Sequence, residues 1–112
     1  MANLNKVFLI GNLTNNPELR QTQSGASVAR FGLAINQRYR DADLELKEDV
    51  CFVNIVAWNK LARAAASYLT KGKSVFIEGK LKLSAFQQEG KQRNKLQVVA
   101  RTIQFLSPRN AK

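Results

Sequence analysis

The sequence predicts an all-β fold, a five-stranded barrel with one short helix between strands 3 and 4. Side chains of different character alternate with a period of two in the segments 28–36, 50–58 and 75–84. Only residues 60–69 show convincing helical spacing. Small residues inside the strand segments, namely Gly11, Gly32 and Ala34, favour the close backbone approach that a small barrel needs.

The first half of the chain contains three strand segments separated by turn-forming residues. The strands cover 7–10, 28–36 and 50–58, with turns at 15–17 and 23–25 and a polar hairpin tip at 38–49. One face of the third strand is small and aliphatic, with Cys51, Val53, Ile55 and Ala57. We expect this face to line the core and Cys51 to be a buried thiol. The opposite face carries Phe52, Asn54, Val56 and Trp58.

The second half of the chain supplies the helix and two more strands. Asn59 is expected to cap the helix, Gly72 to stop it, and the helix to plug one end of the barrel. A fourth strand begins at Val75, and its alternation places Phe86 in register with Lys80 and Lys82. Residues 88–91 form a turn and 95–106 the last strand. This order is that of the OB-fold. We expect one domain over 1–107 and a short basic C-terminal end at 108–112.

The charge of the chain indicates a polyanionic partner. Lys and Arg number 18 against 8 Asp and Glu, a formal charge of +10. Histidine is absent and there is one cysteine, so we expect no metal, no cofactor and no enzymatic activity. No cluster of metal ligands at a useful spacing is visible. No apolar run approaches the ~20 residues that span a bilayer, and no secretion signal is visible.

Four aromatic residues lie among basic residues in strands or strand-edge loops: Tyr39, Phe52, Trp58 and Phe86. Flat side chains let unpaired bases stack while neighbouring cations hold the phosphates, so the pattern indicates single-stranded nucleic acid. The nearest basic residues are Arg38, Arg40, Lys60, Lys80 and Lys82. Core packing and a subunit interface are the competing interpretations for the aromatics, and solvated surface charge for the cations. We interpret Phe8, Phe31, Phe76, Phe105 and Tyr68 as structural instead.

Five collinear motifs carry a family resemblance over nearly the whole chain. They are NKVFLIGNL (5–13), PELR (17–20), IVAWNKLA (55–62), YLTKGK (68–73) and IEGKL (77–81). The chain resembles bacterial-type single-stranded DNA-binding proteins (SSBs). The resemblance implies stacking by Tyr39, Phe52, Trp58 and Phe86. It implies phosphate contacts by Lys6, Arg20, Lys60, Lys71 and Lys82, and less directly by Lys47, Lys73 and Lys80.

The resemblance also implies a function and an assembly. The function is sequence-independent binding and protection of single-stranded DNA in replication, recombination and repair. The assembly is a homotetramer in which the first strand pairs across a dimer interface. The expected location is cytoplasmic and nucleoid-associated, with an organelle as the alternative. Bacterial members usually continue into a flexible linker and an acidic tip that recruits replication and repair proteins. The present sequence ends on basic residues, which leaves such recruitment uncertain.

Two other interpretations stay open at the level of sequence. One is a primosomal replication protein of the same fold, a dimer with fewer aromatics. The other is a basic barrel whose aromatic face binds protein, as in a structural component of the ribosome. RNA stays open as a ligand because stacking does not distinguish the sugars.

Overall fold

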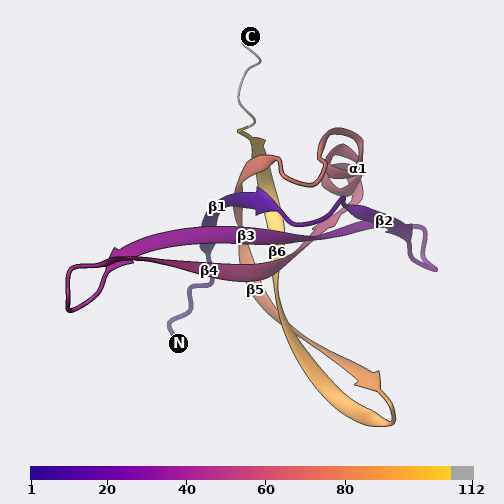
Figure 1. The fold of residues 1–112 in the computed structure, drawn as a ribbon. Coiled ribbons are helices and arrows are strands. Elements are labelled where there is room, and N and C mark those ends of the chain that lie inside the picture. Colours follow the sequence, from indigo (N-terminus) through magenta and orange to yellow (C-terminus); the bar gives the residue numbers. More distant parts are fainter. Residues whose placement is uncertain (107–112) are drawn as a thin grey trace.

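The computed structural model describes residues 1–106, and the side chains of all of these except 86–88. Its elements are β1 (Val7–Leu13), β2 (Glu18–Gln21), β3 (Ser27–Arg40), β4 (Leu46–Trp58), α1 (Asn59–Tyr68), β5 (Ser74–Gln88) and β6 (Lys91–Phe105) (Figure 1). Within these residues no helix is long and apolar enough to cross a membrane. The expected C-terminal end at 108–112 lies outside the described residues.

Five of the strands close a barrel, as the sequence predicts. The order is β1-β5-β6-β4-β3, and β3 returns to β1 through the pairs Asn12–Ala34 and Leu13–Leu33. The pairings are antiparallel except that of β4 with β6, which is parallel at Ile55–Val98 and Val56–Val99. The helix lies between the third and fourth barrel strands in chain order. Strand β2 extends the sheet beside β3, and its exposed, mostly polar residues gave no periodic signal.

The core fills the barrel and continues under the helix. The largest fully buried side chains are Leu33, Ile55, Ile77, Val75 and Val98. Helix α1 joins this core through Ala62 and Ala65, and Leu69 follows directly after it, so the helix covers one end of the barrel as expected. The prediction that Asn59 caps the helix is wrong. Trp58 occupies the capping position without a side-chain hydrogen bond, and the Asn59 Oδ1 instead accepts a hydrogen bond from the Ser27 backbone N–H at 3.4 Å.

Two long hairpins project from the barrel, one formed by β3 and β4 and the other by β5 and β6 (Figure 1). The β3–β4 pairing continues to Arg40–Leu46, so the loop is shorter than the expected 38–49. Cys51 is exposed, and its interpretation as a buried thiol is therefore wrong. The alternation correctly placed Cys51 on the face of Val53. However, residues 46–52 lie on the projecting part of β4 and are all exposed. The face that carries Cys51 therefore does not pack against the core at this point of the strand.

Several aromatics interpreted as structural lie at the surface. Phe31 is buried in the core, which confirms its assignment. Phe8 is 61% exposed and stacks on Phe76, with ring centroids 6.2 Å apart. Tyr68 and Phe105 are also exposed and contact each other, with centroids 5.9 Å apart. The core therefore takes few aromatics, and several remain on the outside of the barrel.

Candidate nucleic-acid interface

The outer face of β3 and β4 presents two of the four candidate aromatics. Phe52 pairs with Ala34 and Trp58 with Val28, without a register shift between them. Residues paired in an antiparallel ladder share a face, and alternate residues return to it. Phe52 and Trp58 therefore lie on one face, about 20 Å apart along the strand. They are 71% and 39% exposed, so unpaired bases can reach both rings.

Tyr39 lies elsewhere on the same hairpin. It pairs with Lys47, which places it on the opposite face of β3 and β4 from Phe52. Its side chain is 50% exposed near the end of the hairpin. The β3–β4 hairpin therefore carries accessible aromatics on both faces. The side chain of the fourth candidate, Phe86, lies outside the described residues.

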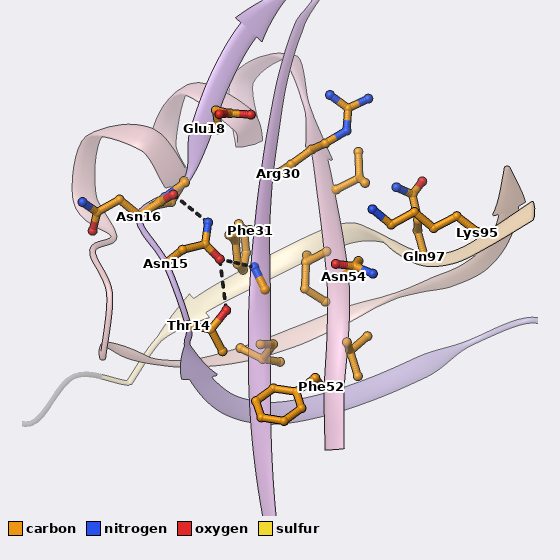
Figure 2. Close-up of a pocket in the computed structure, with 16 residues that line it drawn as sticks. Thr14, Asn15, Asn16, Glu18, Arg30, Phe31, Phe52, Asn54, Lys95 and Gln97 are labelled. Atoms are coloured by element: carbon orange, nitrogen blue, oxygen red, sulfur yellow. Dashed lines mark hydrogen bonds between the residues drawn. The ribbon is translucent and has the colours of Figure 1, made fainter. Parts of the chain in front are cut away.

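A cleft of about 420 Å³ opens beside Phe52 on the outer face of the barrel (Figure 2). Its walls come from the 14–18 segment, β3, β4 and β6, and its polar or charged residues include Asn15, Asn16, Arg30, Asn54, Lys95 and Gln97. Figure 2 shows Phe52 at one end of these side chains and Arg30 at the other. The cleft is large enough for a nucleotide-sized ligand.

The 14–16 segment is held against β3 by side-chain hydrogen bonds. The Gly32 backbone N–H donates to the Asn15 Oδ1 at 2.9 Å, and the Thr14 hydroxyl donates to the same oxygen at 3.0 Å. A Cβ added at Gly32 would overlap the Thr14 hydroxyl. Glycine at this position therefore lets the segment close one wall of the cleft, consistent with the predicted close approach at Gly32.

Lysines of the β5–β6 hairpin continue the same outer face. Lys80 pairs with Val99, Lys82 with Gln97, and Ser84 with Lys95. Since Lys95 and Gln97 line the cleft, Lys82 lies next to it on the neighbouring strand. The hairpin thus adds positive charge beside Phe52, where a strand stacked on that ring would carry its phosphates.

Four of the predicted phosphate-binding residues form ion pairs within the protein. Lys6 contacts Glu78 at 3.1 Å, Arg20 contacts Glu18 at 3.5 Å, Arg38 contacts Glu48 at 3.6 Å and Lys47 contacts Asp41 at 3.8 Å. All four cations are about half exposed or more, so each pair contributes little and a phosphate can compete for the cation. Arg40 donates to the Leu44 carbonyl at 3.0 Å.

The other predicted cations make no ion pair with the described acidic residues: Lys60, Lys71, Lys73, Lys80 and Lys82. Lys71 and Lys73 lie in the loop after α1. The Lys71 backbone N–H donates to the Asn16 Oδ1 at 2.8 Å, and the Lys73 carbonyl accepts from the Leu13 N–H at 2.9 Å. This loop is therefore fixed beside the 14–16 wall of the cleft.

The expectation of no cluster of metal ligands is wrong at the tip of the β3–β4 hairpin. Ligand oxygens of Asp41, Asp43 and Glu45 lie within 4.8 Å of one another. The Asp41 Oδ1 accepts hydrogen bonds from the backbone N–H groups of Asp43 and Glu45, at 2.9 and 3.0 Å. These bonds are typical of a turn stabilised by its own aspartate side chain, which explains why the three carboxylates gather.

The residues of the cleft that the sequence did not nominate include four on the strands β3, β4 and β6: Arg30, Asn54, Lys95 and Gln97. The strand alternation had already placed Asn54 on the face of Phe52. The contribution of β6 had no comparable signal. It depends on the parallel pairing of β4 with β6, which joins segments about 40 residues apart in the chain.

Comparisons with known proteins agree on one family. The model of the single-strand binding protein family matches residues 4–106. A single-stranded DNA-binding protein 2 of Chlorobaculum tepidum is 42% identical, over 97% of this chain and 75% of that protein. A single-stranded DNA-binding protein of Treponema pallidum is 41% identical, over 95% of this chain and 60% of that protein. The present chain therefore spans only part of the length of these relatives.

Solved structures of similar fold lead to the same family. A Plasmodium falciparum SSB in complex with ssDNA superposes with a TM-score of 0.86 at 27% identity, over 96% of this chain and 98% of that chain. A deletion mutant of the single-stranded DNA binding protein from Thermus aquaticus has a TM-score of 0.84 at 30% identity, over 95% and 52% of the two chains.

Proposed function

The chain belongs to the single-strand binding protein family, and on that premise we propose that it binds single-stranded DNA independently of sequence. One observation carries the proposal: Phe52 and Trp58 are exposed on a single outer face beside a cleft rimmed by Arg30 and Lys95. A duplex keeps its bases stacked inside, so such a face favours strands whose bases are free.

Stacking and phosphate neutralisation together supply the binding free energy. Each base stacked on an aromatic ring contributes about 1–3 kcal/mol, and every base offers a π-face. Phe52 and Trp58 supply two such rings, and we propose Tyr39 and Phe86 as the others. The lysines of the β5–β6 hairpin and of the 71–73 loop then bind phosphates, and we propose the same role for Lys60. We also propose this role for Lys6, Arg20, Arg38 and Lys47 once a phosphate displaces their carboxylate partners, and for Arg40 once it releases the Leu44 carbonyl.

The cellular role follows from this mode of binding. A protein that covers exposed strands protects them and removes hairpins during replication, recombination and repair. It acts by binding alone and not as an enzyme, in the cytoplasm at the nucleoid.

We also propose that the protein is a homotetramer. Two observations support association through β1. Strand β1 pairs with β3 only at Asn12 and Leu13, so residues 7–11 present one edge that another copy can extend. Phe8 and Ile10 are exposed beside that edge, and an exposed apolar patch on a basic protein is typical of an interface.

The test of DNA binding compares single-stranded and duplex probes of the same sequence by fluorescence anisotropy. We expect the single strand to bind far more tightly, and Phe52→Leu and Trp58→Leu each to weaken it about 5- to 150-fold. Tyr68→Leu is the matched control, because Tyr68 is an exposed aromatic on α1, away from the cleft. Equal affinity for duplex and single strand would overturn the proposal, and so would wild-type affinity in both cleft-face variants.

A further inference from the structure

We propose that Arg101 binds a phosphate of the strand that stacks on Trp58. This inference rests on the proposed binding of single-stranded DNA and adds a contact that the sequence did not nominate. Three observations support it. A β-bulge turns Arg101 outwards, the alignment of β4 with β6 brings it beside Trp58, and no described carboxylate forms an ion pair with it.

The bulge lies in the ladder between β5 and β6. The ladder pairs Gly79 with Ala100 and then Glu78 with Thr102. Arg101 is therefore an extra residue of β6 with no partner on β5, and such a residue re-aims the side chains around it. Ala100 is buried, whereas Arg101 and Thr102 are both exposed. The bulge thus directs two successive side chains out of the barrel.

Gly79 allows the close approach of the two strands at the bulge. A Cβ at this position would overlap the Val99 carbonyl oxygen and lie 3.1 Å from the Ala100 Cα. Only glycine lets β5 run so close to β6 where the ladder shifts. The main chain therefore sets the direction in which Arg101 leaves the sheet before any ligand binds, which lowers the cost of ordering the side chain on binding.

The parallel pairing of β4 with β6 brings Arg101 beside Trp58. The last pair of this ladder is Val56 with Val99. The next residue of each strand is an alanine, and both alanines are buried, so the same alignment continues beyond the last pair. Trp58 and Arg101 follow these alanines, and both are exposed. Arg101 therefore lies on the strand next to Trp58 and on the same outer face.

The charges around Arg101 leave it available to a phosphate. It forms no ion pair with the acidic residues that the structure describes, and Glu78, which pairs with the next residue of β6, contacts Lys6 at 3.1 Å instead. On the other side of Trp58, strand β2 presents Arg20 in the same cross-strand row. A base stacked on Trp58 therefore has a guanidinium group on either side, and the guanidinium fork matches the geometry of a phosphate.

The experiment measures the affinity for oligo(dT) by anisotropy at four or more salt concentrations, for the wild type, Arg101→Gln and Arg101→Lys. Loss of one phosphate contact should lower the slope of log affinity against log salt by about 0.7, so Arg101→Gln should bind about fivefold more weakly at about 100 mM salt. Arg101→Lys keeps the positive charge, and its slope should equal that of the wild type. Quenching of Trp58 fluorescence at saturation should be unchanged in both variants, because the base still stacks on the ring.

The matched control is Arg63→Gln, the same substitution on α1, where the guanidinium group donates to the Ser27 hydroxyl at 3.3 Å. Its slope should equal that of the wild type, and a fall as large as in Arg101→Gln would overturn the contact. A wild-type slope in Arg101→Gln, with binding retained, would also overturn it and leave the proposed function standing. Loss of Trp58 quenching at saturation in Arg101→Gln would mean that Arg101 positions the ring, which again contradicts the proposal. Absence of single-strand binding by the wild type would overturn both proposals.

Discussion

Removing the positive charges of Lys82 and Lys95 should weaken the salt dependence of single-strand binding. Both lie on the outer face of the β5–β6 hairpin, where they pair across the strands with Gln97 and Ser84. Neither forms an ion pair with a described acidic residue. In the absence of DNA their counterions come from solution, and a bound phosphate releases those counterions.

The magnitude follows from the number of contacts. Each phosphate contact to a single strand contributes about 0.7 to the slope of log affinity against log salt, so two contacts contribute about 1.4. Raising the salt from about 50 to about 200 mM weakens binding of both proteins. The fold-decrease in affinity should be about sevenfold smaller for Lys82→Gln/Lys95→Gln than for the wild type. Each single variant should show about half of the change in slope.

The assay is a titration of single-stranded oligonucleotide by anisotropy at four or more salt concentrations. Arg63→Gln serves as the control, because it removes one positive charge from α1, where Arg63 donates to the Ser27 hydroxyl at 3.3 Å. Its slope should match that of the wild type. A double variant with the wild-type slope would refute the placement of phosphates along this hairpin. If Arg63→Gln lowers the slope of log affinity against log salt as much as Lys82→Gln does, the slope depends on the net charge of the protein and not on the position of the lysines.

Three further predictions follow from the fold. Gly32→Ala should lower the free energy of unfolding in urea by about 1–3 kcal/mol, because the new methyl group overlaps the Thr14 hydroxyl; adding Thr14→Ala should restore part of the loss, and no recovery would contradict this contact. Phe8→Asp should lower the mass measured by light scattering from about four times 12.6 kDa, whereas an unchanged tetramer would remove β1 from the interface. Cys51 should react with a thiol reagent in the native protein, since it is exposed; reaction only after denaturation would contradict its place on the hairpin.

The strand alternation predicted which side chains share a face, but it could not predict how far each strand extends beyond the barrel. Phe52 and Trp58 were placed correctly on an outer face for this reason. The apolar face of Cys51 predicts a place in the core, yet Cys51 lies on the projecting part of β4, before this strand enters the barrel. Tyr39 was grouped with Phe52 because arginines flank it and because the family resemblance implies stacking there. The pairing of Tyr39 with Lys47 places the two aromatics on opposite faces of the hairpin.

Local sequence patterns could not predict the cleft. Its walls combine Asn15 from a loop, Asn54 from β4 and Gln97 from β6, which only the closed barrel brings together. The parallel β4–β6 pairing is short and joins distant segments. No turn signal and no periodicity in the sequence therefore predicts this pairing. Residues whose role depends on a long-range pairing, such as Lys95 and Gln97, were missed for this reason.

Titration of the Trp58 fluorescence with single-stranded DNA tests the central claim most directly. Trp58 is the single tryptophan of the chain, so the signal has one source, and its side chain is accessible on the proposed binding face. We predict strong quenching by a single strand and little quenching by the matched duplex, because only unpaired bases can stack on the ring. Tight binding of the single strand without a change in Trp58 fluorescence would contradict the stacking account.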